Sequence, residues 1–355
     1  MEQIRRLNHW VPASYLSPFT ATGRKDGLLQ LYRRDQPGNP LRPLPPGAIL
    51  KERDMYVIEH EGKLDDTLER MLDKHIEGPF APVRNMVLYG RSVGLTGKLS
   101  EEDRTAVATF VAIQYVRTPK FREQHNLLAE FTGNFVMRAE LQNLAKVQAD
   151  LEHLRGEPVS LEELQEMQRE LESGELRIEV NEKLWLGESL QQAFDMVPLI
   201  LELPWRICWT PPGLSVPTSD TPVVLVRRTS ETTFLHGGGW LEGNVEVTLP
   251  LAPNCVLTVG GALNMYNDQG SPEWFHQVRR RIASGADQWL VSRMPDLEAA
   301  DMFWNSEAPS AVIEFPGGMA RPGDSMYDAV REMMDGNPGE AIMRFGPKDG
   351  PEWWP

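Results

Sequence analysis

Residues 100–119 read SEEDRTAVATFVAIQYVRTP and constrain the fold more than any other stretch of this chain. Ser100, with Asp103 three residues later, is a near match to a capping box, in which side-chain oxygens bind amides of the first helical turn. The pattern predicts a helix that ends before Pro119. Nearly every position between these signals is apolar, and a helix that is apolar all round normally lies in a protein core.

Two polar side chains, Gln114 and Arg117, interrupt this apolar helix. They are three residues apart, so both point to roughly the same side of the helix. A buried guanidinium loses a large hydration energy unless acceptors bind it. We therefore expect distant parts of the chain to bring a carboxylate or carbonyl oxygens to this position.

Glu77 is the predicted partner of Arg117. Apolar residues at helical spacing from Leu64 onward predict a helix that ends at Glu77, next to Gly78-Pro79. A carboxylate at a helix C-terminus is disfavoured by the helix dipole, so another group must stabilise it. The sequence leaves open whether this pair is purely structural or orients a ligand.

Two further polar residues are candidates for the same centre. His9 precedes Val11-Pro12, and because proline disfavours a helix at the residue before it, His9 is expected on an extended segment. Asp220 precedes an apolar strand, where a carboxylate is held rigidly and is exposed enough to act. Its alternative role is a turn, in which it accepts a bond from the amide two residues on.

The remaining pattern is helical as far as residue 203 and strand-like from residue 205. Further helices are predicted over 81–90, 121–154, 157–175, 184–203, 271–291 and 325–334, and strands over 27–33, 55–59, 205–210, 214–216, 222–227, 232–235, 244–251 and 255–260. These elements predict an α+β fold, with a largely helical N-terminal half packed on a mostly antiparallel sheet from the C-terminal half.

The domain prediction is one α+β domain over residues 1–296, with a charged helical insertion at about 146–180. Residues 297–355 are predicted to form an irregular C-terminal extension packed on that body. The insertion is strongly acidic, which is typical of a solvated helix face.

Composition narrows the classes of function. The net charge of −15 works against general nucleic-acid affinity, which depends on Lys and Arg displacing counterions. No apolar run approaches the roughly 18 residues of a membrane helix, and the N-terminus lacks the pattern of a secretory signal. Cys208 and Cys255 have no metal or redox spacing, so we expect reduced, buried thiols and a cytoplasmic protein.

Common catalytic motifs are missing. The sequence contains no P-loop, G-x-G-x-x-G, H-E-x-x-H or C-x-x-C, and no catalytic triad is visible by spacing. The tetrapeptide HGGG at 236–239 is better explained as a hairpin loop than as an oxyanion hole, because the chain has no G-x-S-x-G. His9, Glu77 and Asp220 would make a hard ligand set for Mg, Mn or Fe, but no spacing supports it, so no metal or cofactor is assigned.

Four blocks of the sequence resemble one mainly bacterial family, domain of unknown function 4238. They are Asn8–Leu16 with Phe19, Ile76-Glu77 before Ala81-Pro82, Ile113–Pro119 with Arg122, and Ser219–Val223 before Pro250-Leu251. The resemblance spans about residues 8 to 290 and carries no established activity. It implies that His9, Glu77, Gln114, Arg117, Ser219 and Asp220 belong to one site.

Two functions of different class fit these observations. The first is a hydrolase for a phosphate-containing or nucleotide-like substrate, such as a toxin or phage-defence effector would use. Residues assigned to catalysis are His9, Glu77, Gln114, Arg117 and Asp220, and those assigned to substrate binding are Tyr15, Arg122 and Ser219. Arg117 and Arg122 would bind the anion, with Glu77 or Asp220 as general base. His9 would be the acid or partner, and Gln114 would orient the substrate.

The second function is a non-catalytic binding module, in which the polar network only fixes packing and the acidic insertion is the working surface.

Overall fold

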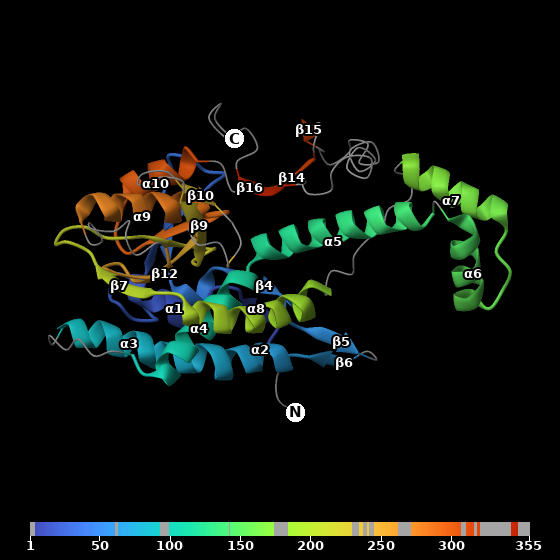
Figure 1. Cartoon of the computed structure of the whole chain (residues 1–355). Coiled ribbons are helices and arrows are strands. Elements are labelled where there is room, and N and C mark those ends of the chain that lie inside the picture. Colours follow the sequence, from blue (N-terminus) through green and yellow to red (C-terminus); the bar gives the residue numbers. More distant parts are fainter. Residues whose placement is uncertain are drawn as a thin grey trace. The chain divides into compact units, whose positions relative to one another are not determined.

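The computed structural model describes residues 4–60, 63–92, 99–141, 143–173, 184–228, 234–236, 240, 245–261, 271–306, 310–315, 318–319 and 342–346. Helices and strands occur in both halves of the chain, and each strand pair with a defined register is antiparallel (Figure 1). The predicted α+β class is confirmed. Contacts divide the chain into two compact units, one of 1–122, 186–310 and 345–355, the other of 123–185 and 311–344. The boundaries predicted from the sequence, 146–180 and 296, stay a prediction.

The first unit is built on a five-stranded sheet in the order β10-β9-β11-β12-β7. Its strands are β7 (Trp205–Trp209), β9 (Val224–Arg228), β10 (Phe234–His236), β11 (Val245–Ala252) and β12 (Cys255–Gly260). All residues of β11 are buried, so elements cover both faces of the sheet. The five strands correspond to predicted strands, whereas the strand predicted over 214–216 is not formed.

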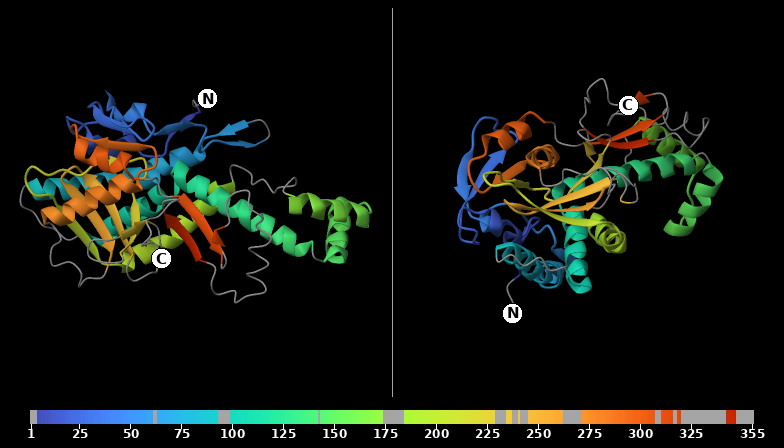
Figure 2. Two further views of the ribbon diagram at one scale, coloured as in Figure 1. Left: turned by 90° about the horizontal axis from the view of Figure 1, so that it is seen from above. Right: turned by 60° about the vertical axis from the view of Figure 1, so that its left-hand side comes forward.

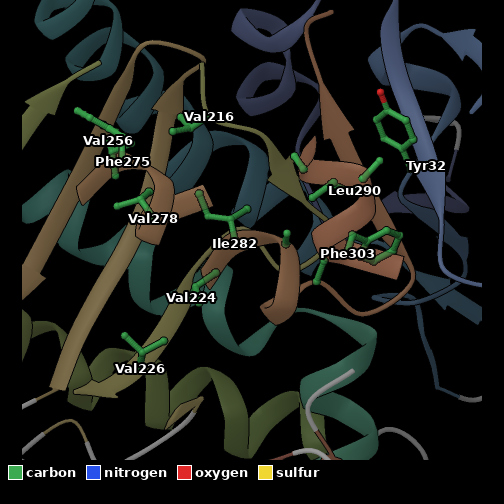
Figure 3. Close-up of a cluster of buried hydrophobic side chains, with 14 of the residues drawn as sticks. Tyr32, Val216, Val224, Val226, Val256, Phe275, Val278, Ile282, Leu290 and Phe303 are labelled. Atoms are coloured by element: carbon green, nitrogen blue, oxygen red, sulfur yellow. The ribbon is translucent and has the colours of Figure 1, made fainter. Parts of the chain in front are cut away.

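Helix α9 (Pro272–Gly285) covers one face of this sheet together with α10 (Leu297–Trp304). Figure 3 shows Phe275, Val278 and Ile282 of α9 directed at Val224 and Val256 of the sheet. The opposite side carries α4 (Glu101–Val116) and α8 (Leu184–Glu202), as Figure 2 shows in its right-hand view. The predicted helices 100–119 and 184–203 are therefore confirmed, and the capping box of Ser100 and Asp103 is formed.

The helix predicted over 271–291 is wrong in its second half. It ends at Gly285, and β13 (Trp289–Ser292) follows as a strand. This strand belongs to a four-stranded sheet in the order β3-β2-β13-β8, with β2 (Leu29–Arg33), β3 (Leu41–Leu44) and β8 (Thr218–Ser219). The reason is tertiary, because β13 gains antiparallel partners on both sides, from segments far away in the sequence.

The N-terminal segment forms short elements around residues 7–65. Strand β1 (Leu7–His9) pairs with β4 (Lys51–Arg53), which confirms the extended conformation predicted for His9. Helix α1 (Ala13–Leu16) and the turns η1 (Ser17–Phe19) and η2 (Pro46–Ala48) are followed by the hairpin β5 (Ile58–His60) with β6 (Lys63–Asp65).

One helical rod extends from residue 67 to residue 92. It comprises α2 (Thr67–Met71), the π-helical segment η3 (Leu72–Glu77) and α3 (Gly78–Ser92). The prediction that the helix ends at Glu77 is wrong, and the helix predicted over 81–90 is part of α3. In a π turn the backbone amide bonds to the carbonyl five residues back instead of four, so the α-helical hydrogen-bond ladder changes register there. Pro79 has no amide hydrogen, and it is tolerated because it lies at the end of this π turn.

The second unit contains most of α5 (Pro119–Glu140), with α6 (Leu144–Arg155) and α7 (Leu161–Ser173). The single helix predicted over 121–154 breaks before Asn143, whose side chain accepts a bond from the amide of Lys146 and so caps α6. A small core of Leu141, Val147, Val159, Leu164 and Leu171 joins these helices. Residues 174–180 of the predicted insertion lie outside the described residues.

The C-terminal extension is described only in part. Helix α10 begins it, and β14 (Ser310–Phe315), β15 (Gly318–Met319) and β16 (Ile342–Gly346) form a three-stranded sheet. The helix predicted over 325–334 and Gly237–Gly239 of the HGGG loop lie outside the described residues. None of the described helices is both long and apolar enough to cross a membrane.

Candidate functional site

Arg117 lies at the C-terminal cap of α4 and is 2% exposed. Its Nε donates to the carbonyl of Trp10 at 2.9 Å, and its Nη2 donates to the carbonyl of His9 at 2.9 Å. Nη2 also contacts Oε1 of Glu77 at 3.0 Å. The predicted ion pair of Arg117 with Glu77 is therefore formed, and backbone carbonyls supply the other acceptors.

Gln114 binds the same segment, because its Nε2 donates to the carbonyl of Trp10 at 2.8 Å. Tyr56 donates from its hydroxyl to the carbonyl of Arg117 at 3.1 Å. Hydrogen bonds to a charged group contribute about 1.5–3 kcal/mol each. The two polar residues of α4 thus fix the N-terminal segment against the core.

Glu77 closes the π-helical segment and has 19% of its side chain exposed. Its Oε1 faces Arg117, and its Oε2 lies 3.4 Å from Oγ of Ser14, which donates to it. The carboxylate is thus held from two sides and still reaches solvent. That combination suits a group that exchanges protons with a bound molecule.

Glu69 is a fourth member of the centre, and the sequence argument missed it. Burial raises the pKa of its carboxyl to about 7, with the charge of Glu77 adding to the rise and that of Arg117 opposing it. Glu69 lies eight residues before Glu77, a spacing that leaves two side chains about 80° apart around an ordinary α-helix. A signal would have required knowledge of the π turn between them.

His9 places its backbone on Arg117 and its ring nearby. Burial lowers the pKa of the imidazole, as does the charge of Lys51, so the ring is neutral near pH 7. Its Nε2 is buried without a hydrogen-bond partner among the described residues, as are Oε1 of Gln114, Nη1 of Arg117 and Nε1 of Trp10. Such atoms call for an explanation, and one is a bound water or ligand.

Asp220 and Ser219 do not share a described contact with this centre. The Asp220 carboxylate accepts bonds from the amides of Asp287, Gln288 and Trp289 at 3.0, 2.7 and 3.1 Å. Burial and the charge of Asp287 raise the pKa of its carboxyl to about 7, and the three amides oppose that rise. The turn bond to the residue two positions on is made by Ser219, whose Oγ accepts from the amide of Thr221. Asp220 therefore connects β8 to the chain before β13.

A comparison with family models shows to which protein family this chain is related. A model described as "Protein of unknown function (DUF4238)" matches residues 8–296, which is most of the 355 residues. The chain belongs to the DUF4238 family. The resemblance found in the sequence is therefore confirmed. No curated protein and no solved structure matches this DUF4238 chain.

Tyr15 and Arg122 of this DUF4238 chain make structural contacts. The buried Tyr15 donates from its hydroxyl to the carbonyl of Pro250 at 2.7 Å and shares a bond with Oγ1 of Thr218 at 2.9 Å. Arg122 binds both carboxylate oxygens of Glu52 at 3.0 Å. The substrate-binding role assigned to both residues stays a prediction.

The structure does not bring together the three residues that the sequence suggested as metal ligands. No three His, Cys, Asp or Glu side chains in the described part of the DUF4238 chain are placed to hold a metal ion, and His9, Glu77 and Asp220 all lie in that part. The site is thus a cluster of His9, Glu69, Glu77, Gln114 and Arg117, which we call the Arg117 centre.

Proposed function

We propose that the protein is a hydrolase that acts on a phosphate-containing, nucleotide-like substrate at the Arg117 centre. The observation that carries this proposal is the position of Glu77, a carboxylate fixed by Arg117 and Ser14 that remains partly exposed. A positioned carboxylate that reaches solvent is equipped to take a proton from water.

Each residue then has a distinct task. Glu77 is the general base that activates the attacking water. Arg117 and Gln114 are positioning residues, since both hold the backbone at Trp10. The neutral ring of His9 donates to the carbonyl of Gly47 and so offers its buried Nε2 as an acceptor, while Nη1 of Arg117 offers a donor for a phosphate oxygen.

A cytoplasmic location is part of the proposal. Cys208 and Cys255 are buried thiols, and burial raises the pKa of Cys208 to about 11, which keeps that thiol protonated and unreactive. Reduced, inert cysteines are typical of proteins that work in a reducing compartment.

One observation favours a second candidate, a non-catalytic binding module. Arg117 is almost completely buried, and two of its bonds go to backbone carbonyls. If fixing the N-terminal segment is the whole task of the network, its side chains need not meet a substrate.

The test is hydrolysis by the full chain of three phosphate probes: ATP, NAD and a single-stranded RNA oligonucleotide. Products are followed by phosphorus NMR, for the wild type and for Glu77→Gln. The amide keeps one oxygen that accepts from Arg117, and its NH2 group can donate to Oγ of Ser14, but it is no base, so we expect a loss of about 100-fold or more in rate with the fold intact. Glu101→Gln, an exposed change in the first turn of α4, is the control and should keep the wild-type rate. Absence of hydrolysis of all three probes by the wild type would support the binding module.

A further inference from the structure

The helical rod that carries Glu77 departs from regular α-helical geometry in the segment that ends at Glu77. Six residues, Leu72–Glu77, form a π-helical segment between α2 and α3. The π-helix is rare, and where it occurs as a single turn it is frequent at functional sites, because it interrupts the regular ladder at a cost in hydrogen-bond geometry. The π-helical segment is therefore a place to look for a functional role.

Its geometric effect is to align Glu69 with Glu77. An α-helix rotates about 100° per residue, so two residues eight apart would lie about 80° from each other around the axis. A π turn closes between residues five apart and takes in one more residue than an α turn. Because of the extra residue, two positions eight apart across the π turn are related like two positions seven apart in a regular α-helix. Positions seven apart lie on the same face of a helix.

The Glu77 carboxylate contacts Nη2 of Arg117 at 3.0 Å, and Glu69 lies on the same side of the rod. The charges of Glu77 and Glu69 both act on the guanidinium of Arg117, and Glu69 and Glu77 act on each other. The groups whose charges act on Glu69 are Arg117 from α4, Glu77 and Asp73 from η3, and Arg5 from the N-terminal lead. Glu69 itself is half-buried, so it is reachable from solvent.

We infer that Glu69 is the proton donor of the reaction whose general base is Glu77, and that the π-helical segment exists to pair them. This inference rests on the proposed hydrolase and assigns its missing acid. Water attacks phosphorus as Glu77 takes its proton, and the bond from phosphorus to the leaving oxygen breaks as Glu69 gives that oxygen a proton. Both carboxyls then exchange their protons with solvent, so the step is balanced.

The division of labour follows from the two environments. Glu77 is paired with the guanidinium of Arg117 at 3.0 Å. The pKa of Glu69 is raised to about 7 by burial first, so the group carries a proton that it can release near neutral pH. His9 is a poor donor by comparison, because burial and Lys51 lower its pKa.

The test combines a direct titration with kinetics on the full chain. Carbon NMR of protein labelled at the glutamate carboxyls, assigned by the signal lost in Glu69→Gln, should give a titration of Glu69 near 7. Glu69→Gln should lower kcat on the hydrolysed phosphate probe about 100-fold and remove the fall of kcat on the alkaline side. Glu101→Gln is the matched control: it removes one exposed carboxylate in the first turn of α4, its charge is not among those that act on Glu69, and it should keep the pH profile.

The outcomes separate the two proposals. A titration of Glu69 near its ordinary value of 4.5 overturns the donor role whatever the kinetics show. Hydrolysis by the wild type that Glu69→Gln retains with its alkaline limb unchanged also overturns the donor role, and leaves the hydrolase standing. No hydrolysis of any probe by the wild type removes the hydrolase and the donor role together, even when Glu69 titrates near 7.

Discussion

Two arginines of this protein are equally buried, yet their carboxylate partners differ. Arg117 and Arg281 each have 2% of the side chain exposed, whereas Glu77 is 19% exposed and Glu246 is 0% exposed. Glu246 lies on the face of β11 that meets α9, because it is directly opposite Val226 of the cluster under that helix. The Arg281–Glu246 pair is enclosed between sheet and helix.

The comparison teaches what separates a structural pair from a candidate site. A sealed pair has no route for a ligand, and its net contribution to stability is small even though removing one partner is costly. The Arg117 centre adds a partly exposed carboxylate and a second carboxyl with a raised pKa. Burial of an arginine alone therefore does not distinguish a structural ion pair from a candidate functional site. The environment of its carboxylate partner has to be known as well.

The largest effect is expected at the sealed pair. Glu246→Leu leaves Arg281 buried without this carboxylate, so the free energy of unfolding should fall by about 3–5 kcal/mol in urea titrations. Glu246→Leu combined with Arg281→Met should recover most of that loss, since an apolar pair replaces the ionic one. A single variant as stable as the wild type would contradict the comparison.

Arg117→Met should cost less, about 2–3 kcal/mol, because it removes bonds to two carbonyls but leaves Glu77 partly hydrated. The measurement is again urea unfolding, with Arg122→Met as a control for a more exposed pair. A loss as large as that of Glu246→Leu would place the two pairs in the same class.

The third effect depends on pH. Burial raises the pKa of Glu69 from 4.5 to about 7 on folding, so between these values the folded protein holds a proton that the unfolded chain has released. Stability should fall as the pH rises through this window. Each pKa unit corresponds to about 1.4 kcal/mol, and partial exposure reduces the total to about 1–2 kcal/mol. Asp220, whose pKa burial also raises to about 7, contributes to the same slope. Glu69→Gln should therefore make the slope shallower than in the wild type, measured by thermal unfolding at several pH values; an unchanged slope would refute the assignment.

The smallest effect is expected at Arg122 and Glu52, where both side chains are partly exposed. Glu52→Gln should change the free energy of unfolding by less than about 1 kcal/mol. It should leave hydrolysis of the phosphate probe unchanged, because the pair lies outside the Arg117 centre. A clear loss of rate would restore Arg122 as a substrate ligand.

The sequence predicted the Arg117 centre as far as local patterns reach. Helical periodicity located Gln114 and Arg117. Glu77 was chosen as the partner from a helix C-terminus that the structure does not have, because the rod continues to Ser92, so the pair is right although the reason given for it is wrong. Glu69 was not predicted, because its alignment with Glu77 depends on a π turn and no residue pattern in the sequence indicates such a turn.

The misses elsewhere have a related cause. Asp220 was grouped with the centre by the family pattern, but its amide partners lie about 70 residues on and meet it only once β13 pairs with β8. The helix predicted through residue 291 failed for the same reason. Non-local strand pairing outweighs local preference, and one sequence does not state it.

The most direct test of the central claim measures Glu77→Gln twice on one preparation, once for hydrolysis of the phosphate probe and once for urea unfolding. The account predicts that hydrolysis falls about 100-fold or more while the free energy of unfolding falls by about 1–2 kcal/mol, well short of the loss expected for Glu246→Leu. An unchanged rate together with a stability loss on the scale of Glu246→Leu would show that the Arg117 centre is as structural as the sealed pair.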